Sequence, residues 1–230
     1  MARKAHDGLL ACGAFAGPLF VAVVVIQALT RNGYDLAEHP LSLLTLGDLG
    51  WIQSATFVLG GVLVGAFAVG LRRALEDRAA RWMALFTGLF GLGLVAAGIF
   101  RPDPSLGFPP GAPSGTPEEL STSAILHGVG FAVAIGGLTL ASLVFARRGV
   151  ANGERGWAAY SVFSAATALV LAMWPGENGA SIRYFVATLV AFTWTTAVAL
   201  RVRAGVEVPR DAIEPVGPPA LGGRRSYSNY

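Results

Sequence analysis

The sequence has few charged residues: Asp, Glu, Lys and Arg make up 13% of its 230 residues, about half the share of a typical soluble domain. It also has a single cysteine, which excludes an intramolecular disulfide framework and a cysteine-rich zinc or iron–sulfur site. Hydrophobic residues account for 53% of the chain, so an intrinsically disordered protein is excluded as well. These shortages point to a membrane protein.

Six stretches of 17 to 21 residues contain none of the 31 charged residues. Their lengths are close to the roughly 20 residues that a helix needs to cross the hydrocarbon core of a bilayer. Backbone groups in lipid must find their hydrogen bonds within the protein, so apolar runs of this length form helices. The sequence therefore predicts an all-α membrane protein, a bundle of six transmembrane helices at about 9–29, 51–71, 82–100, 125–145, 157–174 and 184–200.

The basic residues lie mostly at one set of helix ends. Fourteen of the 17 Lys and Arg residues flank the ends on the side of the two termini, and only Arg31, Arg101 and Arg183 flank the opposite ends. Because positive charge marks the cytoplasmic side of a membrane protein, we expect both termini to be cytoplasmic. This topology accounts for the basic character of the chain, which is then no indication of nucleic-acid binding.

This topology divides the chain into three parts. We expect a cytoplasmic N-terminus at residues 1–8, a membrane domain at 9–203, and a disordered cytoplasmic tail at 204–230, where prolines are frequent. The expected location is the plasma membrane, with the lipid bilayer as partner. Sixteen arginines against one lysine favour a bacterial protein from a G+C-rich genome. The sequence indicates neither protein partners nor an oligomeric state.

Glycines are frequent in the second to fourth predicted helices. Small residues allow helix backbones to approach closely inside a membrane, so we expect tight packing among these three helices. The glycines concerned are Gly61, Gly65, Gly88, Gly91, Gly93, Gly98, Gly128, Gly130, Gly136 and Gly137.

Three polar residues are expected at one depth of the membrane, on the side away from the basic residues. His39 precedes the second helix, Asp103 follows the third, and His127 lies two residues inside the fourth. Imidazole and carboxylate groups suit zinc or another divalent ion, and histidine also serves as a general acid or base. Structural roles are the alternative: His127 would hydrogen-bond within the bundle, and His39 and Asp103 would cap helix ends.

The candidate site residues follow from this arrangement. The candidates for catalysis or for a divalent metal cofactor are His39, Asp103 and His127. The candidates for ligand binding are Ser42, Glu38 and Arg183. An arginine such as Arg183 can hold an anionic headgroup through its planar guanidinium group, although an ion pair within the protein explains it equally well.

Several short motifs are characteristic of one family. They are Glu38-His39-Pro40-Leu41-Ser42, Gly47-Asp48-Leu49-Gly50-Trp51, Gly98-Ile99-Phe100-Arg101-Pro102-Asp103-Pro104 and Leu126-His127-Gly128. With these motifs the chain resembles, over about residues 9–203, the large prokaryotic family of six-helix membrane proteins filed as domain of unknown function 998. The resemblance implies a compact six-helix bundle without an established activity, in which His39, Ser42, Asp103 and His127 are the matched polar positions.

The functional expectation is accordingly broad. We expect an integral membrane protein of unknown molecular function whose polar or metal site, on the side away from the basic residues, binds or acts on a lipid or small molecule. Whether the protein is an enzyme stays open. One alternative is a structural or accessory membrane protein without chemistry of its own. A small-solute transporter is another, although five of the six predicted helices have no ionisable residue to line a path.

Overall fold

The computed structural model describes residues 2–75, 77–175 and 179–207, and six long helices make up most of them. The elements in chain order are α1 (Ala2–Thr30), the short 3-10 helix η1 (Leu41–Thr45), α2 (Gly50–Ala74), α3 (Arg78–Ile99), α4 (Thr122–Ala151), α5 (Arg155–Met173) and α6 (Ala180–Glu207). All six α-helices are long and apolar enough to cross a membrane. The predicted all-α architecture with six membrane-length helices is therefore confirmed, whereas most of the predicted tail, residues 208–230, lies outside the described residues.

Most helices extend beyond their charge-free stretches. The helix α4 is the clearest case, because it spans Thr122–Ala151 around a predicted core of 125–145. At its end, α2 includes Arg72 and Arg73. Arginine is a good helix former whose long side chain reaches water from the end of a span. The Arg72–Arg73 pair thus ends the apolar stretch of α2 without ending the helix.

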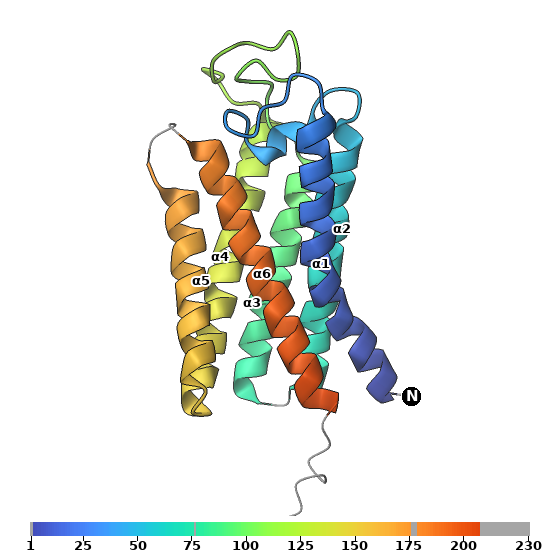
Figure 1. Ribbon diagram of the computed structural model, residues 1–230, viewed down its shortest axis with the longest axis vertical. Helices are drawn as coiled ribbons and strands as arrows, with labels where there is room; N and C mark the ends of the chain where they lie inside the picture. Colours follow the sequence, from blue (N-terminus) through green and yellow to red (C-terminus); the bar gives the residue numbers. More distant parts are fainter. Residues whose placement is uncertain (1, 76, 176–178, 208–230) are drawn as a thin grey trace, which may run out of the picture.

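The helices form a ring in the order of the chain. Each helix packs against the next, and α6 returns to pack against α1 (Figure 1). The connections 31–49 and 100–121 lie together at one end, the top in Figure 1, which we call the loop end. The short connections after α2 and α4 lie at the opposite end together with the N-terminus, and we call this the basic end.

Glycines bring the backbones of α2, α3 and α4 into contact, as expected. A Cβ atom on Gly91 of α3 would lie 2.6 Å from the carbonyl oxygen of Gly61 in α2. On the other side of α3, a Cβ atom on Gly93 would lie 2.5 Å from the carbonyl oxygen of Gly130 in α4. No side chain fits at these crossings. By contrast, a Cβ atom on Gly128 or Gly136 would meet nothing within 4 Å.

Three ion pairs join neighbouring helices near the basic end. Asp77 binds Arg148 at 2.6 Å, Glu154 binds Arg201 at 2.5 Å, and Asp7 binds Arg203 at 2.5 Å. They connect α3 to α4, the start of α5 to α6, and α1 to α6. All six side chains are partly exposed, so water screens each pair and its contribution to stability is small. Their main effect is to fix which helix ends lie together.

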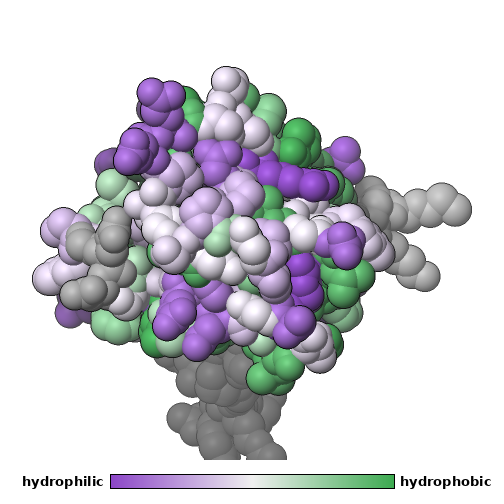
Figure 2. Space-filling model, turned by 90° about the horizontal axis from the view of Figure 1, so that it is seen from above, coloured by the Kyte–Doolittle hydropathy of each residue, from purple (hydrophilic) through white to green (hydrophobic). Residues whose placement is uncertain are grey.

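The sides of the bundle are apolar where they face outward. The loop end, seen from above in Figure 2, has hydrophilic and intermediate residues at its centre and hydrophobic residues around its edge. Large exposed apolar side chains come from each of the helices, among them Phe15, Val62, Leu92, Val129, Phe163 and Val186. An aqueous surface rarely carries so many, whereas a bilayer would solvate them. The fold thus fits an integral membrane protein.

Alanine substitutions at two glycines of α3 should differ in their effect on stability. In Gly91→Ala, the new methyl group meets the Gly61 carbonyl oxygen at 2.6 Å, so we expect a loss of about 1–3 kcal/mol, typical of overpacking. In Gly88→Ala, the nearest atom is 3.9 Å away, and the higher helix propensity of alanine should leave stability unchanged or raised by up to about 1 kcal/mol. Thermal unfolding of the detergent-solubilised variants measures both. Equal midpoints would contradict the close α2–α3 contact.

Candidate functional site

His39 joins the two large loops at the loop end. It is 4% exposed, and its Nδ1 accepts a hydrogen bond of 2.8 Å from the backbone N–H of Asp35. The proton of the neutral ring is therefore on Nε2, which donates to the carbonyl oxygen of Leu106 at 2.8 Å. Both ring nitrogens are thus engaged by the backbone, and the tautomer is fixed. In this arrangement His39 holds the loop 31–49 against the loop 100–121.

An aromatic cluster surrounds His39. It consists of Tyr34, His39 and Phe108, whose ring centroids lie 5.4–5.5 Å apart, and we call it the loop cap. The Tyr34 hydroxyl donates to the carbonyl oxygen of His39 at 2.8 Å, and burial raises the pKa of Tyr34 far above its usual range. Arg31 lies over the Phe108 ring at 5.6 Å and donates to the carbonyl oxygen of Leu46 at 2.5 Å. The cap therefore also attaches to the end of α1.

Asp103 and Glu38 have contacts that organise helix starts. The Asp103 carboxylate accepts a hydrogen bond of 2.8 Å from the backbone N–H of Ser121, whose hydroxyl caps α4 by accepting from the N–H of Ala124. Hydrogen bonds from the Ser121 side chain and backbone hold the pKa of Asp103 below its usual range. The carbonyl oxygen of Glu38 accepts from the hydroxyl of Ser181 at 2.7 Å, which joins the loop 31–49 to the first turn of α6. Arg183, half-buried in that turn, has an interaction of its own.

His127 of α4 hydrogen-bonds to carbonyl groups at the end of α3. Its Nδ1 lies 3.0 Å from the carbonyl oxygen of Ala97 and 2.9 Å from that of Phe100. Both partners are acceptors, so Nδ1 carries the proton and donates it. The last carbonyl groups of a helix have no partner within the helix, and His127 supplies one from α4. The other nitrogen, Nε2, is then an acceptor in the neutral ring, and no described residue hydrogen-bonds to it.

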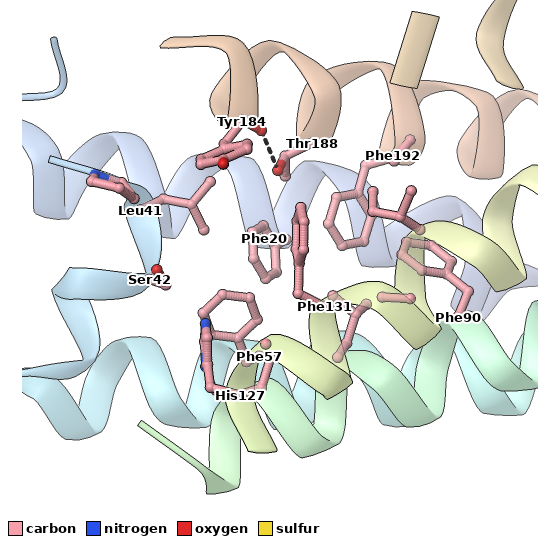
Figure 3. Close-up of a pocket in the computed structure, with 17 residues that line it drawn as sticks. Phe20, Leu41, Ser42, Phe57, Phe90, His127, Phe131, Tyr184, Thr188 and Phe192 are labelled. Atoms are coloured by element: carbon pink, nitrogen blue, oxygen red, sulfur yellow. Dashed lines mark hydrogen bonds between the residues drawn. The ribbon is translucent and has the colours of Figure 1, made fainter. Parts of the chain in front are cut away.

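His127 also lines a cavity of about 240 Å³, drawn in Figure 3. The cavity lies between α1, α2, α3, α4, α6 and η1, and none of the described residues that line it is charged. Its walls contain six aromatic rings, those of Phe20, Phe57, Phe90, Phe131, Tyr184 and Phe192. An apolar cavity of about 150 Å³ is able to hold benzene, so this one has room for a larger apolar group.

The rings of three phenylalanines pack together at the inner end of the cavity. There the buried ring of Phe192 stacks on Phe20 at 4.6 Å and contacts Phe90 at 5.8 Å. Half-buried residues line the part nearer the loop end, where Phe131 of α4 contacts Tyr184 of α6 at 5.6 Å. Phe192 follows Tyr184 by eight positions, which corresponds to about 12 Å along a helix. The cavity thus extends from the loop end toward the middle of the bundle.

The structure brings together only two of the predicted site residues in this cavity. Ser42 and His127 both line it, and Figure 3 shows their polar atoms facing the same open space. His39 and Asp103 do not line it. Within the described residues, no group of three or more His, Cys, Asp or Glu is placed to hold a metal ion. The divalent metal stays a prediction.

The aromatic walls of the cavity were not predicted from the sequence. One signal was available in α4, where His127, Phe131, Ala134 and Ile135 follow one another at helical spacing and all line the cavity. Residues three or four positions apart share one face of a helix. A histidine on this face distinguishes it from an ordinary lipid-facing surface. The other walls come from segments far apart in the chain, so no comparable spacing marks them.

A comparison with known families gives one match. The model of a family described as protein of unknown function (DUF998) matches residues 14–205. No curated protein and no solved structure matches the chain.

Replacing His39 by phenylalanine should loosen the loop end. His39→Phe keeps an aromatic ring beside Tyr34 and Phe108 but leaves the Asp35 N–H and the Leu106 carbonyl without their partner. A buried polar group that loses its partner costs about 1–3 kcal/mol. We expect faster amide hydrogen exchange at 34–39 and 105–108, measured by mass spectrometry, with unchanged exchange at the basic end. Unchanged exchange in both loops would show that His39 does not hold them together.

The role of Asp103 should depend on pH. Its pKa is lowered in the folded protein from the ordinary value of about 3.9, so its contribution to stability is present above that value and is lost as the pH falls through the folded-state pKa. The thermal unfolding midpoints of wild type and Asp103→Asn should therefore differ at about pH 6, and the difference should shrink as the pH falls below about 3.9. A difference that persists at low pH would mean that the Ser121 contact does not depend on the ionised carboxylate.

Proposed function

This chain belongs to the DUF998 family of proteins of unknown function, and we propose that it binds an amphiphilic, lipid-like molecule in the aromatic cavity. The observation that carries this proposal is the combination of apolar walls with the polar groups of Ser42 and His127 in one cavity of about 240 Å³. Binding sites for small molecules are typically apolar, with a few placed polar groups that orient the ligand. The apolar part of the ligand would lie against Phe90, Phe131 and Phe192.

The orientation in the membrane supports an entrance from outside the cell. Most of the arginines lie at the basic end, and positive charge is retained on the cytoplasmic side during insertion. We therefore place both termini in the cytoplasm and the loop end on the outer face of the plasma membrane. The cavity would then be reached from the outer leaflet, where lipids and other amphiphiles are concentrated.

Binding is favoured over transport by the rings that pack at the inner end of the cavity. Phe192 contacts Phe20 and Phe90 there, so a solute that passed through the cavity toward the basic end would have to move these rings. The described residues that line the cavity also include no charged side chain to guide a polar solute.

Photolabelling tests the proposal directly. A photoreactive alkyl diazirine added to the purified chain in detergent should label peptides that contain Phe131 and Phe192, and the labelling should saturate. Gly128→Trp places a large side chain at a glycine that lines the cavity and has open space around it, so labelling should fall several-fold. The matched control is Gly136→Trp, on the same helix, also in open space and outside the cavity lining.

The distribution of the label decides the outcome. Labelling that is confined to outward-facing residues such as Phe15 and Phe163, and that is equal in the two tryptophan variants, would contradict a ligand site. A structural or accessory role without a bound ligand would then be the better explanation of this fold.

A further inference from the structure

We propose that the polar end of the ligand is an uncharged hydroxyl group, so that the cavity selects a single-chain lipid alcohol. This inference rests on the proposed function, because it concerns the occupant of the same cavity. It follows from the hydrogen-bonding capacity of the polar groups that line the cavity, the absence of charge among its described lining residues, and its size.

In its neutral form, His127 offers the ligand an acceptor and no donor. The proton of the neutral ring is on Nδ1, which donates to the carbonyl oxygens of Ala97 and Phe100. These two bonds also fix the orientation of the ring at the end of α3. The remaining nitrogen, Nε2, has a lone pair and no hydrogen-bond partner among the described residues. A ligand that satisfies Nε2 must therefore present an O–H or N–H group.

Ser42 offers a hydroxyl that both donates and accepts. Its backbone is held in η1, where its carbonyl oxygen accepts a bond of 2.7 Å from the Thr45 hydroxyl. No described residue hydrogen-bonds to the Ser42 hydroxyl itself, which faces the cavity together with His127 (Figure 3). An alcohol matches the hydrogen-bonding capacity of this pair, because its oxygen is able both to donate to Nε2 and to accept from Ser42.

The cavity does not suit an anionic headgroup. A buried carboxylate or phosphate requires a cation or several donors to replace its lost hydration. The described lining residues include no Lys or Arg. Their side-chain hydroxyl donors are those of Ser42, Tyr184 and Thr188, and the Thr188 hydroxyl already donates to the carbonyl oxygen of Tyr184. Arg183, which precedes Tyr184 in α6, does not line the cavity and already has an interaction of its own. Fatty acids and phospholipids are therefore disfavoured relative to an alcohol.

The size of the cavity limits the apolar part to one chain or a small ring system. Its volume of about 240 Å³ is below the roughly 300–1,000 Å³ that is usual for drug-sized ligands. The depth of about 12 Å between Tyr184 and Phe192, from the helical rise, accommodates a chain of medium length. Two acyl chains would not fit beside one another.

Competition with the photolabel tests the hydroxyl. The competitors are decanol, its methyl ether and decanoate, used with the full-length chain in detergent. The ether keeps the oxygen as an acceptor for Ser42 but has no proton for His127, so we expect decanol to compete about tenfold better. Decanoate should compete less well than decanol because its charge finds no cation in the described lining.

Two variants assign the effect to individual atoms. His127→Asn keeps an amide N–H as donor for the Ala97 and Phe100 carbonyls but has no Nε2. Competition by decanol should therefore fall to the level seen with the ether, while competition by the ether is unchanged. In Ser42→Ala, decanol and its ether should both compete less well with the photolabel, and decanol should still compete better than the ether. Unchanged competition by the ether also shows that the variant is folded.

The possible failures are distinguishable. Equal competition by decanol and its ether in the wild type, or stronger competition by decanoate, would overturn the hydroxyl inference and leave the ligand site intact. Absence of any saturable labelling would overturn the proposed function itself. If the ether no longer competed in His127→Asn, that variant would not be informative. The comparison of decanol with its ether in the wild type and in Ser42→Ala would then test the hydroxyl inference.

Discussion

The structure depends on one constraint: every polar backbone group inside a bilayer must find its hydrogen bond within the protein. Helices meet this requirement along their length but not at their ends. Where α3 ends, the N–H of Arg101, which would bond to the carbonyl oxygen of Ala97 in a continued helix, donates to the Ser123 hydroxyl, and His127 of α4 donates to the carbonyl oxygens of Ala97 and Phe100 instead. The same bonds that complete α3 leave Nε2 of His127 as the acceptor in the cavity. The chemistry of the cavity is therefore a consequence of how a helix ends.

The sequence predicts the helices well because charge is costly in a membrane. The six charge-free stretches identify all six helices, and the glycines at 61, 91, 93 and 130 identify the tight contacts among α2, α3 and α4. The helix ends are less predictable. Arg72 and Arg73 end the apolar stretch of α2 but lie inside the helix, since the backbone has no reason to unwind where the lipid gives way to water.

The structure brings two of the candidate residues, Ser42 and His127, to one cavity and leaves His39 and Asp103 outside its lining. A sequence does not reveal the hydrogen-bond partner of a ring nitrogen: that of His39 is the carbonyl of Leu106, 67 residues away. Nor could it reveal the aromatic walls. These helices are apolar on most sides, so a phenylalanine that faces the cavity, such as Phe90, follows no pattern that separates it from one that faces lipid, such as Phe15.

The loop cap connects the residues outside the cavity to those inside it. Ser42 belongs to η1, and the loop that carries η1 is attached to α1 through Arg31, to the loop 100–121 through His39, and to α6 through Ser181. Because η1 has only five residues and crosses no membrane, these attachments determine where its Ser42 hydroxyl lies relative to His127. His39 therefore acts on the cavity without lining it. It positions the loop that completes the cavity wall, as Asp103 positions the start of the helix that carries His127.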